Sequence, residues 1–131
     1  MIYLLDTNAI IALLGGREPL LSRVRACRPR DVVVSAIVTY ELLYGAYKSR
    51  NREKNLAKVA ALQFESLALD DEDARHAGEI RATLERAGSP IGPYDLLIAG
   101  QTRARSLTLV TRNTGEFQRV PGLSIENWEM D

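Results

Sequence analysis

The sequence predicts an α/β fold with a parallel sheet. Three short apolar runs each end abruptly in a polar residue, and helical patterns separate them. The runs are residues 2–5 before Asp6, 32–34 before Ser35, and 107–110 before Thr111. Continuous apolar runs of this length are typical of strands that are buried on both faces, as in a parallel sheet. The alternation of such strands with helices gives the order expected of α/β proteins.

Length and composition indicate one globular domain over residues 1–131. Hydrophobic residues make up 46% of the chain and charged residues 26%, which excludes a disordered protein. No apolar run approaches the roughly 20 residues that span a bilayer, and no basic segment precedes the first apolar run. We therefore expect a cytoplasmic protein without a membrane partner. Because Cys27 and His76 are the only residues of their types, any metal must be held by oxygen ligands.

The first half of the chain predicts two strands and four helices. After the first strand, a helix is expected over residues 9–14, ended by two glycines, and another from Pro19 to about residue 28. Ser35 is a suitable N-cap for a third helix to about residue 49, and a fourth runs from residue 51 or 52 to about 64. Asp6 is open to two interpretations. It either caps the first helix or lies as a ligand at the carboxyl edge of the sheet.

Glu41 has an unusual position on the third helix. Ile37, Tyr40, Tyr44 and Gly45 share its face by three-and-four spacing, which predicts that Glu41 lies within an apolar stripe. A buried glutamate is costly unless it is paired. The alternative is that Glu41 borders the core and reaches water.

The second half predicts a short strand at residues 67–69 and helices at 71 to about 87 and 94–105. Four acids at residues 70–73 suit the cap and first turn of the earlier helix, so we interpret them as structural. Pro93 suits the start of the later helix, and Asp95 lies in its first turn. Asp95 also shares a face with Ile98, Ala99 and Thr102, so it is expected to face inward. An edge strand at 123–125 and Trp128 complete the chain.

Acidic residues from distant segments are expected to meet at one edge of the sheet. They are Asp6, Glu41, Asp95 and, after the last buried strand, Asn113 with Glu116. Like charges in one pocket repel, and a divalent cation is the simplest way to keep them ionised. Oxygen ligands select Mg²⁺ or Mn²⁺, which suits metal-assisted hydrolysis of nucleic acid. Between residues 17 and 58, ten basic residues stand against four acidic ones, which favours a polyanionic partner.

Four segments resemble one known family over nearly the whole chain. They are LLDTN, VTYELLYGA, GSPIGPYDLLIAGQTRARSLTLVT and RNTGEFQRVPGLSIENW. Together they resemble PIN-domain nucleases, and more narrowly the VapC-type ribonuclease toxins of type II toxin–antitoxin systems. The resemblance implies a PIN-like three-layer α/β/α fold around a central, mainly parallel sheet of four to five strands.

The resemblance also implies an activity and partners. It implies an endoribonuclease that depends on Mg²⁺, or on Mn²⁺ in its place, and a homodimer that can assemble further with its antitoxin. A VapB-type antitoxin would block the site with its tail and bind DNA with its other half. RNA would be the substrate, with tRNA, and the anticodon region of initiator tRNA in particular, as an expected target.

Carried over by position, the resemblance assigns roles within the site. Asp6 and Asp95 would be the principal metal ligands, with Glu41 as the third catalytic acid. Thr7, Asn8 and Thr111 would brace the site. Many relatives have an aspartate where this chain has Asn113, so either Glu116 supplies the fourth acid or the charge is missing. The expected RNA contacts are Arg50, Arg52 and Arg112.

Three alternatives make different demands on the sequence. A haloacid-dehalogenase-like phosphatase needs a second aspartate where this chain has Asn8. A receiver-like signalling module that binds Mg²⁺ needs paired acids after the first strand and a late lysine, but no lysine follows Lys58. A catalytically inactive PIN-fold binding partner would not need the acids that are present here.

Overall fold

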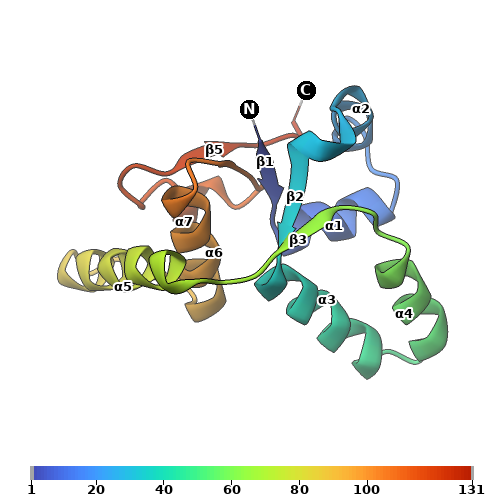
Figure 1. Ribbon diagram of the computed structural model, residues 1–131, viewed down its shortest axis with the longest axis horizontal. Helices are drawn as coiled ribbons and strands as arrows, with labels where there is room; N and C mark the ends of the chain where they lie inside the picture. Colours follow the sequence, from blue (N-terminus) through green and yellow to red (C-terminus); the bar gives the residue numbers. More distant parts are fainter. Residues whose placement is uncertain (1, 131) are drawn as a thin grey trace.

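The computed structural model describes residues 2–130, which form one five-stranded sheet surrounded by helices (Figure 1). The strands are β1 (Tyr3–Leu5), β2 (Val32–Ser35), β3 (Glu65–Leu67), β4 (Thr108–Val110) and β5 (Ser124–Glu126). The helices are α1 (Thr7–Leu14), α2 (Leu20–Ala26), α3 (Ala36–Lys48), α4 (Arg52–Ala60), α5 (Asp71–Arg86), α6 (Pro93–Ala104) and α7 (Thr114–Phe117). A single 3₁₀ turn, Pro29–Asp31, precedes β2.

All strand pairs are parallel, in the order β3-β2-β1-β4-β5. β1 is therefore central, paired with β2 on one side and β4 on the other. The leucine and valine side chains of these three strands are at most 5% exposed, as continuous runs buried on both faces require. The predicted α/β architecture with a parallel sheet is confirmed, and the sheet has five strands.

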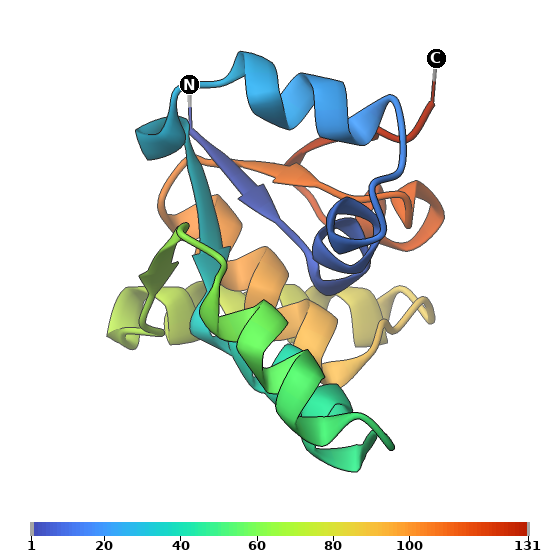
Figure 2. The ribbon, with the colours of Figure 1, turned by 90° about the vertical axis from the view of Figure 1, so that its right-hand side faces the viewer.

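Helices cover both faces of the sheet. In Figure 1, α5 and α6 lie on one side of the strands, and α1 and α2 lie on the other. Figure 2 shows α3 and α4 extending away from the sheet beyond the carboxyl end of β2. Because every strand runs in the same direction, β1, β2 and β4 end at one edge. α1 and α3 begin at this edge, and α7 lies just beyond it in sequence.

Three local predictions were wrong. β3 lies at Glu65–Leu67 instead of 67–69, because the backbone carbonyls of Leu67 and Ala68 are taken by side chains of α6. α4 ends at Ala60, four residues early, because a turn closes the helix there. The predicted inner face of α3 is also wrong. Its buried residues are Val38, Leu42 and Ala46, whereas Tyr40 and Tyr44 are 49% and 59% exposed.

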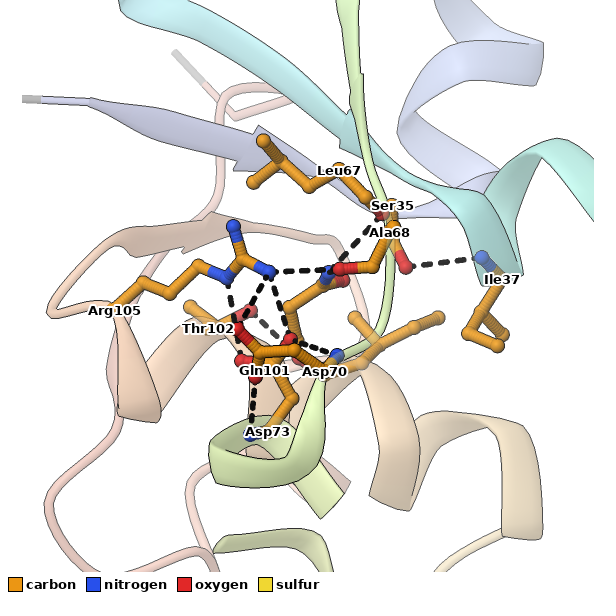
Figure 3. Close-up of polar contacts among 10 residues, drawn as sticks. Ser35, Ile37, Leu67, Ala68, Asp70, Asp73, Gln101, Thr102 and Arg105 are labelled. Carbon is orange, nitrogen blue, oxygen red and sulfur yellow. Dashed lines mark hydrogen bonds and ion pairs between the residues drawn. The ribbon is translucent and has the colours of Figure 1, made fainter.

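A polar network fixes α6 against β3 and α5 (Figure 3). The buried Gln101 donates from Nε2 to the carbonyls of Leu67 and Ala68, both at 3.1 Å. Arg105 donates from Nη2 to Asp73 at 2.9 Å and to the Ala68 carbonyl at 2.7 Å. Asp73 also completes a capping box with Asp70, and Asp71 and Glu72 lie in the first turn of α5, as the sequence predicted. This network anchors the C-terminal half of α6.

Gly100 allows α5 and α6 to pack closely. A Cβ atom placed on Gly100 would lie 2.6 Å from the backbone nitrogen and from the Cβ of Ala77. The absence of a side chain at residue 100 is therefore a requirement of this helix contact. Ile98, Ala99 and Thr102 are buried on α6, as the sequence predicted.

Candidate active site

Asp6 directly follows the central strand and is 5% exposed. Its Oδ1 accepts a hydrogen bond of 2.8 Å from the backbone N–H of Ala9, so Asp6 does cap α1. Burial raises the pKa of Asp6, hydrogen bonds from Thr111 and Ala9 oppose this shift, and the nearby charges of Glu129 and Glu41 add to it. The helix-cap role and a position beside other acids therefore occur together at this residue.

Glu41 reaches the same edge from α3. Its Oε1 accepts a hydrogen bond of 2.8 Å from the hydroxyl of Thr7, the residue that follows Asp6. Glu41 is half-buried and next to the buried stripe of α3, so it borders the core. The second of the two interpretations of Glu41 is therefore correct. The Thr7 contact joins the first residue of α1 to the middle of α3 and directs the Glu41 carboxylate toward the end of β1.

Asp95 lies in the first turn of α6, where Pro93 occupies the first position as predicted. Its pKa is raised from 3.8 to about 6. Burial is the largest cause, followed by the negative charges of Glu116, Asp6 and Glu41 and by a hydrogen bond with Glu116. Three acids from three other segments therefore act on Asp95. A carboxyl group under such repulsion binds a cation or a proton readily.

The segment after β4 supplies Thr111, Asn113 and Glu116. Thr111 is 1% exposed, and its hydroxyl oxygen accepts a 2.9 Å hydrogen bond from the backbone N–H of Asn113. Asn113 in turn donates from Nδ2 to Glu116 Oε2 at 3.0 Å. Glu116 lies on α7, a short helix that the sequence analysis did not predict. Asn113 thus supplies no charge but orients the acid that does.

The structure brings together the four predicted acids, Asp6, Glu41, Asp95 and Glu116, with their neighbours Thr7, Thr111 and Asn113. The set contains only oxygen ligands, and its members repel one another, which suits Mg²⁺ or Mn²⁺. Within residues 2–130, no three Asp, Glu, His or Cys side chains already surround one point closely enough to hold an ion. Glu41 and Glu116 are held by Thr7 and Asn113, so a shared ion requires their flexible side chains to rotate.

The predicted RNA contacts separate into two groups. Arg112 directly follows Thr111, whose hydroxyl bonds to Asp6, and it lines a hollow together with Asn8. Arg50 and Arg52 lie at the turn between α3 and α4. That turn begins beyond the far end of α3, about 14 Å along the helix axis from Glu41. The structure does not bring these two arginines to the acids.

Glu129 is a fifth acid near the site that sequence reasoning missed. Its side chain is 9% exposed, and its charge raises the pKa of Asp6. Oε1 lies 3.5 Å from Arg17 Nη1, and Oε2 is buried without a hydrogen-bond partner among residues 2–130. No periodicity marks residue 129, because it follows the last strand in an irregular segment. The buried Trp128 beside it was the available signal.

The described part of the chain contains no helix that is both long enough and apolar enough to cross a membrane. The sequence is matched by the family model for the PIN domain over residues 3–123. A tRNA(fMet)-specific endonuclease VapC of Salmonella typhimurium is 41% identical over 128 residues, which cover 96% of this chain and 97% of that protein. A ribonuclease VapC1 of Haemophilus influenzae is 36% identical over 132 residues, 98% of each.

Solved structures show the same similarity. The DNA-bound VapBC of Salmonella typhimurium contains a chain that superposes with a TM-score of 0.93 at 41% identity, covering 98% of both chains. VapBC2 of Rickettsia felis, bound to a DNA fragment from its promoter, gives a TM-score of 0.92 at 34% identity and covers 98% of this chain and 99% of that one. The similarity therefore extends through the whole fold, including the edge at which the acids lie.

Proposed function

Because this chain belongs to the PIN-domain family, and within it to the VapC ribonuclease toxins of toxin–antitoxin systems, we propose that its four acids bind Mg²⁺ or Mn²⁺ and cleave RNA. The meeting of four acids from separate segments at one edge of the sheet carries the proposal, because Glu116, Asp6 and Glu41 all act on Asp95. In natural proteins, carboxylates that repel one another in this way are found mainly at functional sites. The two rivals outside the PIN fold, a haloacid-dehalogenase-like phosphatase and a receiver-like signalling module, belong to other families.

The proposed roles follow from the contacts of each side chain. Asp6 and Asp95 are the principal ligands, and Glu41 and Glu116 complete the set. The hydroxyl of Thr111 and the N–H of Ala9 favour the ionised form of Asp6, while Thr7 holds Glu41. Asn8, in the first turn of α1, remains a supporting residue. When bound, a divalent cation supplies the charge that activates water and stabilises the leaving oxygen.

The proposed substrate is tRNA, and initiator tRNA in particular. The supporting observation is the specificity stated in the names of relatives that are 41% and 39% identical over almost the whole chain. Purified protein incubated with total RNA and Mg²⁺ or Mn²⁺ should create new RNA ends in initiator tRNA, which sequencing would locate. A chelator should abolish these ends, and added metal should restore them. Ends that persist in the chelator, or no new ends with either metal, would contradict the proposal.

We propose that an antitoxin segment docks in an apolar groove between α1, α3 and α4. The groove has a volume of about 370 Å³, and its lining includes Leu14, Leu42, Val59 and Glu41. Solved relatives of this chain are VapBC complexes, which supports this partner. An amphipathic segment in this groove would end beside an acid of the site and so obstruct it.

Leu14→Asp tests the docking groove. Leu14 is 40% exposed, so the change should not unfold the protein, but it places a charge in the apolar lining. Antitoxin affinity should fall by about tenfold or more, as expected for a charge buried in an apolar interface, with RNA cleavage retained. Ile2→Asp, at 41% exposure before β1, is the matched control. Equal antitoxin affinity in calorimetry for both variants would exclude the groove as the docking site.

We further propose that the toxin forms a homodimer through exposed tyrosines. Tyr40, Tyr44 and Tyr47 on α3 and Tyr94 on α6 are 43–59% exposed. The rings of Tyr40 and Tyr94 lie 5.3 Å apart, and their hydroxyl oxygens are 3.0 Å apart. Aromatic side chains gathered on one surface are typical of interfaces. A monomer mass in light scattering at micromolar concentration would argue against this dimer.

A further inference from the structure

A small hollow lies beside the acids and runs along α1. It has a volume of about 200 Å³ and is lined by Asn8, Ile11, Ala12, Gly15, Arg17 and Arg112. Asn8 is two residues from Asp6, and Arg112 follows Thr111, whose hydroxyl bonds to Asp6. One end of the hollow therefore adjoins the proposed catalytic centre, and both of its charged lining residues are arginines.

Arg17 connects the hollow with the acids. Its Nη1 lies 3.5 Å from Oε1 of Glu129, and the charge of Glu129 acts on Asp6. The Arg17 side chain is 59% exposed, so most of its five N–H donors remain available to a ligand. Glu129 is nearly buried and holds this guanidinium at the boundary between the acids and the hollow.

Arg112 lines the hollow from the segment that follows β4. It is exposed, and within residues 2–130 its guanidinium makes no hydrogen bond or ion pair. Several other arginines of the chain are engaged by carboxylates, as Arg105 is by Asp73. Arg112 is thus a cation that the fold places beside an acidic centre without neutralising it.

We propose that Arg17 and Arg112 bind the RNA phosphate next to the one that is cut. This inference rests on the proposed ribonuclease function. An RNA strand that approaches four carboxylates is repelled at every phosphate, and a cation in the acidic centre offsets this only at the cleaved one. The neighbouring phosphate needs its own positive charge, and the planar guanidinium fork suits phosphate oxygens. The RNA backbone then runs from the acids along α1, and Asn8 is a neutral donor between the two sites.

The test measures RNA binding without cleavage. Arg17→Gln and Arg112→Gln are made in an Asp95→Asn background, and labelled tRNA is titrated at several salt concentrations with fixed Mg²⁺. Each change should weaken binding by about tenfold. The double change should lower the slope of log affinity against log salt by about 0.7, the value for one lost phosphate contact on a single strand, and each single change should lower it by part of that amount. Arg86→Gln, which removes an exposed arginine from the end of α5, is the matched control.

Two further variants separate binding from folding and from chemistry. Because Arg17→Gln leaves Glu129 without its cation, the double change Arg17→Gln with Glu129→Gln should show the same loss of RNA affinity. With Asp95 intact, the arginine changes should raise KM much more than they lower kcat. If both arginine variants match Arg86→Gln in affinity and salt slope while Asp95→Asn abolishes cleavage, the phosphate site is refuted and the ribonuclease function stands. If the wild type cleaves no RNA, both the ribonuclease function and the phosphate site that rests on it are refuted.

Discussion

Asp95→Asn is expected to reduce RNA cleavage by about a thousandfold or more, because it removes one of the two principal cation ligands that we propose. The fold should survive. Burial and three neighbouring acids raise the Asp95 pKa to about 6, so the folded protein prefers the protonated form. Protonated Asp95 therefore favours the folded state at low pH. This contribution to the free energy of unfolding is lost as pH rises from about 4 through 6. Asn mimics the protonated form, so the metal-free variant should melt at or above the wild-type temperature at pH 8, with a smaller difference at pH 4.

Cleavage of labelled tRNA under single-turnover conditions and thermal melts at the two pH values test this prediction. Asp71→Asn, in the first turn of α5, is the control that removes a carboxylate away from the site. Cleavage by Asp95→Asn at the rate of Asp71→Asn would refute the assignment of Asp95. Mn²⁺ affinity of the wild type should also decline below about pH 6, as Asp95 takes up a proton.

Glu116→Gln separates the two candidates for the fourth ligand. Asn113 donates a hydrogen bond to Glu116, and Glu116 interacts with Asp95, so loss of the Glu116 charge should weaken Mn²⁺ binding measurably. An unchanged Mn²⁺ titration would leave that role to Asn113 or to no residue.

Gly100→Ala is expected to destabilise the protein by about 3 kcal/mol, because overpacking at a backbone contact forces two helices apart. The added Cβ would lie 2.6 Å from backbone and side-chain atoms of Ala77, which cannot move without displacing α5. Cleavage should fall as well, since α6 carries Asp95. Urea denaturation followed by circular dichroism measures the stability change.

Gly78→Ala is the matched control for this helix pair. Gly78 lies on α5 next to Ala77, and a Cβ there meets no atom within 4 Å. Alanine should therefore stabilise α5 by about 0.5–1 kcal/mol through its higher helix propensity. If the two variants unfold at the same urea concentration, close packing at Gly100 is not what limits stability.

The sequence predicted the parts of this fold that local patterns determine. The runs ending at Leu5, Val34 and Val110 are strands because each is apolar on both faces, and Asp95 faces inward because its helix partners are buried. The face of α3 was misjudged for a physical reason. Tyrosines counted as apolar in the pattern, but three of them on this helix lie on the surface, and smaller side chains fill the contact instead.

The candidate site was predictable where residues end a strand or begin a helix. Asp6, Asp95 and Thr111 follow from the rule that parallel strands end at one edge. The positions of Glu129 and α7 could not be predicted from this rule, because they depend on how the chain returns after β4. Arg17 could not be assigned to the site from the sequence, since an arginine in a basic segment has no distinguishing pattern. Only its contact with Glu129 places it there.

The central position of β1 has a consequence for synthesis of the toxin. β1 pairs on one side with residues 32 and 33 but on the other with residues 108–110, which are synthesised long after β1. Thr111, which supports Asp6, is made later still. A nascent chain that stops before β4 therefore lacks one neighbour of β1 and the support of Asp6, so the proposed site can assemble only after this segment has been made.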